Sequence, residues 1–282
     1  MRSSTLTDVA ELAQRLRGGN VLVVDCRFEL SDPARGARDY AQGHIPGAVY
    51  ANLDRDLSDL SQYGLGRHPL PESTSFSAVL SRWGWTPQTP LVAYDAANGA
   101  LAAARLWWMM RLVGLRDVTV LDGGWPAWQA AGLPVDSAPA SVRGSHVDVA
   151  FDARQIVYAD ELKRMREHIV LLDARGVPRY RGEVEPIDKV AGHVPGAYNR
   201  PFNDNLAPDG RFKPVESLRA EFSALLEDRV PSDVVHMCGS GVTACHNLLA
   251  MEHAGLSGSR VFAPSWSGWI SDPANPVARG DG

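Results

Sequence analysis

The sequence predicts an α/β protein made of two tandem domains, each an open, mostly parallel β-sheet with helices on both faces. Two observations support this fold class. Short apolar segments alternate with segments of helical spacing along the 282 residues, and motifs of the first half return in the same order in the second. A chain of this length can build two hydrophobic cores of ordinary size.

Four pairs of matching segments define the repeat. They are Val21–Arg27 with Val170–Arg175, Gly43–Ala48 with Gly192–Ala197, Leu91–Asp95 with Val234–Cys238, and Trp125–Trp128 with Trp266–Trp269. A repeat this long indicates a duplicated domain rather than a solenoid. We therefore expect an N-terminal domain over residues 1–135, a Pro-, Ser- and Gly-rich linker over 136–152, and a C-terminal domain over 153–282.

Local patterns account for the elements of each copy. Asp8 and Glu11 form a capping pattern for a helix that ends at Gly18–Gly19, and the unalternated run Val21–Val24 is typical of a strand covered on both faces. The first copy continues with a helix over 76–83, a strand over 91–94, a helix over 100–112 and a strand over 118–121. The second is expected to have helices over 160–168, 215–227 and 244–254 and strands over 169–172 and 233–237.

The paired Gly-His-x-Pro-Gly-Ala motifs are interpreted as structural. Their glycines and prolines favour a tight turn, and we expect His44 and His193 to satisfy backbone groups rather than to act on a substrate.

The composition excludes several classes of function. Apolar residues make up 45% and charged residues 22% of the chain, and the formal net charge is −5, which argues against a general nucleic-acid or membrane-surface binder. Neither a membrane-spanning run nor an apolar signal segment is evident, so we expect a cytoplasmic protein. Three cysteines do not make a disulfide framework, and no metal-ligand, nucleotide or flavin motif is evident. We expect no metal and no cofactor.

The most informative stretch is Cys238–Cys245, which reads Cys-Gly-Ser-Gly-Val-Thr-Ala-Cys. It follows an apolar strand and opens a helix, so successive backbone N–H groups and the positive helix end can stabilise a thiolate at Cys238. The alternative is a buried cysteine at a strand end beside a glycine-rich turn. Asp95 occupies the matching position of the first copy, which therefore lacks a sulfur nucleophile.

With the duplication, the two Gly-His-x-Pro-Gly-Ala segments and the Cys238 loop, the chain resembles the two-domain rhodanese family over nearly its whole length. The resemblance implies a sulfurtransferase that holds sulfur on Cys238 as a persulfide and passes it to a thiophilic acceptor. The loop N–H groups would stabilise the sulfur anion, and the residues assigned to this role are Gly239, Gly241, Val242, Thr243 and Ala244. For Thr243 we favour a different role, that of a hydroxyl at the start of the following helix.

The family also suggests the sulfur donor. Thiosulfate-preferring members usually carry basic residues directly after the cysteine, whereas Gly239 and Ser240 stand here, as in the mercaptopyruvate type. That type is associated with a Ser-His-Asp arrangement, which Ser240, His68 and Asp54 match in this sequence. Since His68 and Asp54 lie in the first half, such a site would draw on both domains. The alternative is that His68 and Asp54 form a solvated loop pair.

The carboxylate of a mercaptopyruvate donor needs a cation. The resemblance implies that Arg179 is the substrate arginine of the family. An arginine suits this role better than a lysine because a guanidinium pairs with a carboxylate through two hydrogen bonds. Relatives of this type commonly carry a second arginine about nine residues on, where this chain has Asp188 and Lys189; Lys189 is a candidate substitute. We expect Arg181 to lie on the surface.

Alternatives remain open. The donor is 3-mercaptopyruvate or thiosulfate, the acceptor a thiol, cyanide or a thioredoxin-like protein, and the protein is expected to be a monomer. A non-turnover module that carries sulfur or senses redox state is a second class of function. A phosphatase is disfavoured because Ala244 stands where an arginine would clamp the phosphate. Cys245 is either a resolving thiol or a buried filler, and Cys26 is assigned to the core.

Overall fold

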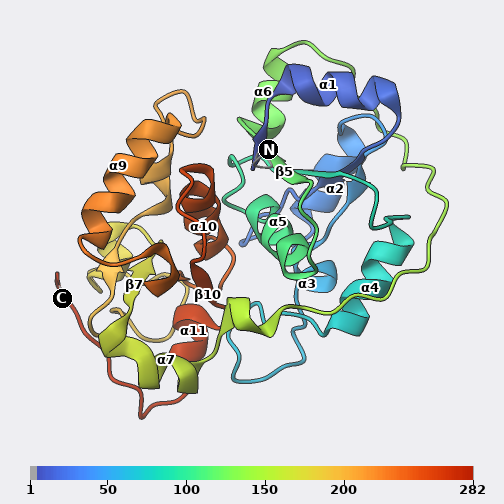
Figure 1. Cartoon of the computed structure of the whole chain (residues 1–282). Coiled ribbons are helices and arrows are strands. Elements are labelled where there is room, and N and C mark those ends of the chain that lie inside the picture. The colour runs from blue at the N-terminus through green and yellow to red at the C-terminus, as the bar shows by residue number, and fades with distance from the viewer. Residues whose placement is uncertain (1–4, 282) are drawn as a thin grey trace. The chain divides into compact units, whose positions relative to one another are not determined.

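The computed structural model describes residues 5–281, which divide into two units (Figure 1). Among these residues the first unit comprises 5–59 and 70–152, drawn from blue to green in Figure 1, and the second comprises 60–69 and 153–281, which ends in red. Within the described range no helix is both long and apolar enough to cross a membrane.

The elements of the first unit follow the predicted alternation. They are β1 (Leu6–Thr7), α1 (Val9–Gly18), β2 (Leu22–Asp25), α2 (Arg35–Gln42), β3 (Val49–Tyr50), α3 (Leu53–Asp56), α4 (Ser73–Arg82), β4 (Leu91–Tyr94), α5 (Ala103–Leu112), β5 (Val118–Leu121) and α6 (Gly124–Ala130).

The second unit repeats this order with additional short 3₁₀ turns. Its elements are β6 (Ile156–Val157), α7 (Ala159–Met165), β7 (Val170–Asp173), α8 (Val177–Tyr180), β8 (Tyr198–Asn199), α9 (Val215–Leu226), β9 (Val234–Met237), α10 (Ala244–His253), β10 (Arg260–Phe262) and α11 (Ser265–Trp269). The 3₁₀ turns are Ala153–Gln155, Arg166–His168, Phe202–Asn205 and Pro231–Asp233.

Each unit contains a five-stranded parallel sheet flanked by helices, and the two sheets have the same topology. The strand order is β1-β5-β4-β2-β3 in the first and β6-β10-β9-β7-β8 in the second. In both, the chain runs outward from one central strand to the sheet edge and returns on that strand's other side. The order therefore reverses between β2 and β4, and between β7 and β9, which is where open α/β sheets bind ligands.

Local signals placed most boundaries within a few residues. The Asp8 carboxylate accepts the Glu11 backbone N–H at the start of α1, and Gly19, at φ 67°, ends that helix as expected. The predicted 100–112 helix instead begins at Ala103, since backbone N–H groups just before it donate to Asp95. The predicted 160–168 helix ends at Met165 and continues as a 3₁₀ turn.

The stretch predicted as a linker has its own packing. Extended chain over 145–151 runs along α4 and donates alternate backbone N–H groups to that helix. The N–H groups of Val147, Val149 and Phe151 reach the hydroxyls of Ser81, Ser77 and Ser73 in turn. Serines one helical turn apart match every second residue of an extended chain, so this stretch belongs structurally to the first unit.

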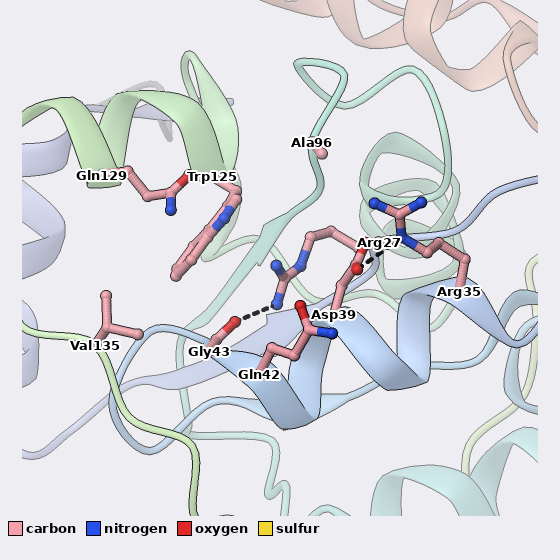
Figure 2. A pocket seen from close by; sticks show the side chains of 9 residues that line it. All are labelled: Arg27, Arg35, Asp39, Gln42, Gly43, Ala96, Trp125, Gln129 and Val135. Carbon is pink, nitrogen blue, oxygen red and sulfur yellow. Dashed lines mark hydrogen bonds and ion pairs between the residues drawn. The ribbon is translucent and has the colours of Figure 1, made fainter.

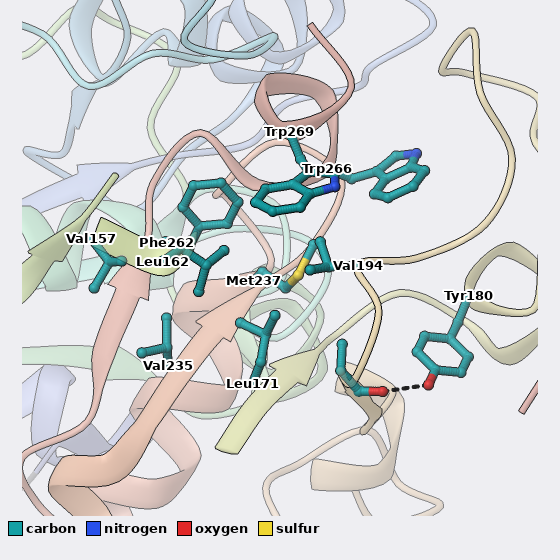
Figure 3. Packing of buried hydrophobic residues seen from close by; sticks show 11 residues of the cluster. Val157, Leu162, Leu171, Tyr180, Val194, Val235, Met237, Phe262, Trp266 and Trp269 are labelled. Atoms are coloured by element: carbon teal, nitrogen blue, oxygen red, sulfur yellow. Dashed lines mark hydrogen bonds between the residues drawn. The ribbon is translucent and has the colours of Figure 1, made fainter. Parts of the chain in front are cut away.

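The core of the second unit lies between the sheet and α11 (Figure 3). Two tryptophans of α11, Trp266 and Trp269, are fully buried there, and the Tyr180 hydroxyl donates to the Ala197 carbonyl at 2.5 Å. The cluster consists of Val157, Leu162, Leu171, Tyr180, Val194, Ala197, Val235, Met237, Phe262, Trp266 and Trp269. This packing holds the carboxyl end of β9, whose last residue, Met237, belongs to the cluster.

Both histidines of the Gly-His-x-Pro-Gly-Ala motifs are structural, as predicted. His44 Nδ1 bonds the Tyr40 carbonyl at 2.7 Å, and His193 Nδ1 bonds the Tyr180 carbonyl at 2.9 Å. Each imidazole also stacks on the ring of the same tyrosine. Neither histidine is exposed.

Asp95 closes the loop after β4. Its buried carboxylate accepts five backbone N–H groups, at 2.8 Å from Ala97 and Gly99 and at 3.1 Å from Leu101, Ala102 and Ala103. The donors Leu101, Ala102 and Ala103 lie at the start of α5, where backbone N–H groups have no acceptor within the helix. The loop is thus built around a fixed negative charge.

Replacing Asp95 with alanine should therefore destabilise the first unit severely. Five buried N–H groups would lose their acceptor, and we expect a loss of roughly 3–5 kcal/mol in unfolding free energy. Urea denaturation followed by circular dichroism measures this. Asp117, an exposed partner of Arg15, supplies the control, and its alanine variant should lose less than about 1 kcal/mol. Similar losses in both variants would contradict the role given to Asp95.

His236, in the middle of β9, should make folding sensitive to acid. Complete burial lowers the pKa of its imidazole to about 3, and its Nε2 bonds the Ser259 hydroxyl at 3.1 Å. The folded state therefore keeps the ring neutral, while the unfolded state binds a proton below pH ~6.5. The free energy of unfolding therefore decreases as the pH falls from ~6.5 toward the folded-state pKa of about 3.

Because of this histidine, we expect the free energy of unfolding to fall by about 2 kcal/mol between pH 7 and 5, at roughly 1.4 kcal/mol per pH unit below pH ~6.5. Urea unfolding at both pH values, compared between the natural protein and His236→Leu, measures the difference. The variant should lose about 2 kcal/mol less. An equal loss in the two proteins would show that the imidazole does not carry the effect.

Candidate active site

Cys238 lies directly after β9, beside the point where the strand order reverses. β9 pairs with β7 on one side and β10 on the other, so the carboxyl end of β7 adjoins the loop. The cysteine is only 3% exposed. This is the position in an open parallel sheet where ligands bind, as the sequence predicted.

Backbone contacts with α11 hold the loop in place. Ser265 accepts the Cys238 N–H through its hydroxyl at 3.1 Å, and the N–H groups of Trp266 and Ser267 donate to the carbonyls of Cys238 and Gly239. Ser265 has a left-handed backbone at φ 52°, which few non-glycine residues adopt. Its counterpart in the first unit is Gly124, at φ 54°. The serine thus keeps an unusual conformation and adds a buried hydroxyl under Cys238.

The loop turns back on itself before α10. Gly241 has φ 77°, and the first helical bonds run from Cys245 N–H to the Val242 carbonyl and from His246 N–H to the Thr243 carbonyl. Within the described residues, the backbone N–H groups of Ser240 and Val242 have no protein acceptor. These donors are available to an anion held in the loop.

Thr243 does not cap α10 as we expected. It stands at the first capping position, but its side chain makes no capping hydrogen bond to the helix. The reason is its helical backbone, φ −69° and ψ −19°, because a capping side chain needs an extended backbone to reach the following N–H groups.

Asp95 in the first unit indicates what the Cys238 loop is suited to hold. It occupies the same position after the equivalent strand, and its carboxylate gathers the loop's N–H groups. A negative charge is therefore compatible with this loop geometry. In the second unit the charged atom at that position would be the Cys238 sulfur.

His68 and Ser240 lie together beside the cysteine. The His68 Nδ1 and the Ser240 Oγ are 2.8 Å apart in a hydrogen bond, and both side chains are buried. We expected His68 to come from the first domain. Instead, residues 60–69 group with the second unit, so this pair belongs to one unit.

Close backbone contact explains why this segment joins the second unit. Gly66, at φ 93°, packs so tightly that a Cβ there would lie 2.5 Å from the Pro264 carbonyl oxygen. The next residue, Arg67, donates its N–H to the Ser267 hydroxyl at 2.9 Å, and the Ser271 hydroxyl donates to the Gly64 carbonyl. The segment is thereby fixed against α11, the helix that also holds the Cys238 loop.

Two arginines lie beside Gly239, the residue that follows the cysteine. Arg179 pairs with Glu185 at 2.8 Å and with Asp188 at 3.0 Å, and Arg67 pairs with Asp188 at 2.5 Å. A Cβ on Gly239 would lie 3.1 Å from Arg67 Nη2 and 3.5 Å from Arg179 Nη2. Both guanidinium groups therefore lie next to the residue that follows the cysteine.

The surroundings of the Glu185 carboxylate, beside Arg179, favour its ionised form. Burial alone would raise the pKa of Glu185, but N–H groups of Asp188 and Ile187 and the Arg179 guanidinium more than offset this, and the pKa is lowered. Behind it, Arg175 bonds Asp173 and lies over the Trp266 ring at 4.8 Å. The guanidinium groups are held rigidly by charged partners.

The remaining predicted residues have different surroundings. Asp54 lies half-buried in α3 of the first unit, and Lys189 is exposed in the second unit. Cys245 is a buried helical residue whose thiol donates to the Gly241 carbonyl at 3.4 Å. Cys26 is buried, and burial, followed by the charge of Asp95, raises its pKa. Arg181 pairs at the surface with Asp281, as expected.

The first unit has a pocket of its own, of about 460 Å³, near the carboxyl ends of its strands (Figure 2). Arg27 lines it, bonded to the Gly43 carbonyl and stacked over Trp125 at 4.6 Å. The other lining residues are Arg35, Asp39, Gln42, Ala96, Gln129 and Val135. This lining includes no cysteine, serine or histidine, and Asp95 is fully occupied by backbone donors. Among its described lining residues, this pocket therefore carries no thiol, hydroxyl or imidazole that could act as a nucleophile.

Three residues that shape the site were not predicted from the sequence: Arg67, Asp188 and Ser265. Arg67 was readable as the neighbour of His68, and Asp188 was noticed only as a missing arginine. Ser265 could have been found from the repeat, since it replaces Gly124 of the first copy. None of these signals identified a contact by itself.

Comparison with known proteins agrees with the fold and the repeat. Residues 8–131 and 158–272 each match the rhodanese-like domain. The chain is 49% identical, over the full length of both proteins, to a probable 3-mercaptopyruvate sulfurtransferase of Pseudomonas aeruginosa. It is 40% identical to the putative thiosulfate sulfurtransferase SseB of Mycobacterium tuberculosis, covering 99% of this chain and 98% of that protein.

A solved structure supports the same assignment. The 3-mercaptopyruvate sulfurtransferase from Leishmania major superposes with a TM-score of 0.83 at 31% identity, covering 94% of this chain and 73% of that one. The resemblance inferred from the Cys238 loop and the repeated motifs is confirmed. The chain belongs to the rhodanese-like family and carries two copies of its domain.

Proposed function

We propose that the protein is a sulfurtransferase that takes sulfur from 3-mercaptopyruvate onto Cys238 and passes it to a thiophilic acceptor. The observation that carries this proposal is the buried Cys238 in a loop whose counterpart holds a carboxylate through five N–H groups. Named relatives over the full length of the chain support the same activity.

The first half-reaction breaks the carbon–sulfur bond of the donor. The Cys238 thiolate attacks the donor sulfur, a sulfur–sulfur bond forms, and the bonding electrons leave with the carbon as the enolate of pyruvate. The enolate takes a proton from the Ser240 hydroxyl, which His68 restores through their hydrogen bond. Loop N–H groups stabilise the persulfide anion.

In the second half-reaction an acceptor thiolate attacks the outer sulfur of the persulfide. That sulfur–sulfur bond breaks, Cys238 leaves as a thiolate, and the acceptor becomes the persulfide. Cyanide would take the same sulfur as thiocyanate. The thioredoxin-like acceptor, the cytoplasmic location and the monomeric state stay predictions, as does the assignment of Asp54 as the carboxylate that orients His68.

Thiosulfate is the second candidate donor, and one relative is named for it. The absence of basic side chains at Gly239 and Ser240 favours the monoanionic keto acid over this dianion. A non-turnover sulfur carrier, the other alternative, would be persulfidated without releasing pyruvate catalytically. Steady-state release of pyruvate separates the two.

The nucleophile is tested by Cys238→Ser. Turnover of 3-mercaptopyruvate with a thiol acceptor should fall to background because serine cannot form the persulfide. Intact-protein mass measurement after donor treatment should find one added sulfur atom in the natural protein and none in the variant. Cys245→Ala is the matched control and should keep the added sulfur. Loss of that sulfur in Cys245→Ala, or its retention in Cys238→Ser, would overturn the assignment.

The proton donor is tested by Ser240→Ala. Pyruvate needs a proton to leave, whereas sulfite does not, so kcat with 3-mercaptopyruvate should fall about 100-fold and kcat with thiosulfate by much less. His68→Gln should show the same pattern as Ser240→Ala, with a larger loss of kcat for 3-mercaptopyruvate than for thiosulfate. Equal losses with both donors would remove Ser240 and His68 from proton transfer. Steady-state kinetics with cyanide as the common acceptor gives both values.

A further inference from the structure

The charged side chains beside Gly239 form one connected cluster. Asp188 is nearly buried and bridges two segments far apart in sequence, bonding Arg67 through one oxygen and Arg179 through the other. Glu185 accepts from Nε and Nη2 of Arg179, so Arg179 Nη2 is shared between the two carboxylates and Nη1 bonds neither of them. The position where relatives of the mercaptopyruvate type carry a second arginine thus holds a carboxylate, and a second guanidinium arrives from residue 67 instead.

Three guanidinium nitrogens of this cluster have no protein acceptor in the described part of the chain. Arg67 Nε is buried without a partner, Arg67 Nη2 lies beside Gly239, and Arg179 Nη1 lies 3.6 Å from a Cβ placed on that glycine. An unpaired buried donor is costly unless a ligand or water takes it. Together these nitrogens can receive a planar carboxylate beside Cys238.

The balance of charge limits what the cluster can receive. Three arginines face three carboxylates, so the group carries no net charge: Arg67, Arg175, Arg179, Asp173, Glu185 and Asp188. A neutral cluster that presents directed N–H donors suits a single carboxylate. It offers little excess positive charge to a compact dianion, which costs more to desolvate.

We propose that Asp188 determines the class of sulfur donor, by holding Arg67 and Arg179 as a paired fork for one carboxylate and by cancelling one of their charges. This inference rests on the proposed function, in which an anionic donor delivers sulfur to Cys238. Arg67 is the second donor-binding arginine, and Asp188 is a positioning residue that acts through both arginines. The site selects monoanionic keto-acid thiols against thiosulfate.

Two substitutions test the proposal through the ratio of kcat/KM for 3-mercaptopyruvate to that for thiosulfate. Asp188→Asn leaves the guanidinium groups with one more positive charge but a looser alignment. It should lower kcat/KM for the keto acid about tenfold and raise that for thiosulfate several-fold. Arg67→Met should raise KM for the keto acid at least about tenfold and leave kcat nearly unchanged.

An exposed ion pair of the same unit supplies the controls. Arg181→Met and Asp281→Asn remove the same charges from the surface and should leave the donor ratio within about twofold. The charge-exchanged double variant, Arg67→Asp with Asp188→Arg, keeps the pair and the count of guanidinium groups, and should recover most of the ratio. Equal losses for both donors in Asp188→Asn, without recovery in the double variant, would reduce Asp188 to a structural role.

A binding measurement separates this inference from the proposed function. In the Cys238→Ser background, calorimetric titration with pyruvate and with thiosulfate reports anion preference without sulfur transfer. We expect pyruvate to bind with a lower Kd than thiosulfate. Asp188→Asn should reduce the ratio of the two Kd values or reverse the preference. If the natural protein turns over neither donor but this shift appears, the proposed function fails and the inference holds. An unchanged preference would overturn the inference, whatever the turnover.

Discussion

Backbone N–H groups that open a helix directly after a parallel strand need an acceptor, and this need organises both halves of the molecule. In the first unit the Asp95 carboxylate meets it permanently, with five hydrogen bonds that also delay the start of α5. In the second unit the equivalent position holds Cys238. One loop therefore binds the carboxylate of its own Asp95, and a cysteine occupies the matching position after the equivalent strand of the other.

The second constraint is the close docking of residues 60–69. Gly66 allows this segment to touch the backbone of α11, and the contact fixes two adjacent side chains with different tasks. His68 reaches Ser240, and Arg67 reaches Asp188. Because α11 also holds the Cys238 loop through Ser265, one short helix contacts both that loop and the segment that carries Arg67 and His68.

Much of the fold was predictable because it depends on local or repeated patterns. The Asp8 cap, the stop at Gly19 and the strands 91–94 and 118–121 follow from short-range chemistry. The duplication required one topology twice, and both sheets have it. The predicted start of α5 was wrong because Asp95 accepts backbone N–H groups there. The predicted cap by Thr243 was wrong because the backbone dihedral angles of that residue are helical.

The residues of the site also fall into those that the sequence predicts and those that only the structure brings together. The sequence alone determined that Cys238 is the nucleophile candidate, that Asp95 replaces it in the other copy, and that Ser240 lies in the loop, because these residues are adjacent along the chain to a strand end or a glycine turn. Only the tertiary structure decided that His68 and Arg67 belong with the second unit and that Asp188 joins two arginines. The contacts of Arg67 with Asp188 and of His68 with Ser240 connect segments more than a hundred residues apart, so their geometry depends on packing between elements and leaves no local pattern in the sequence.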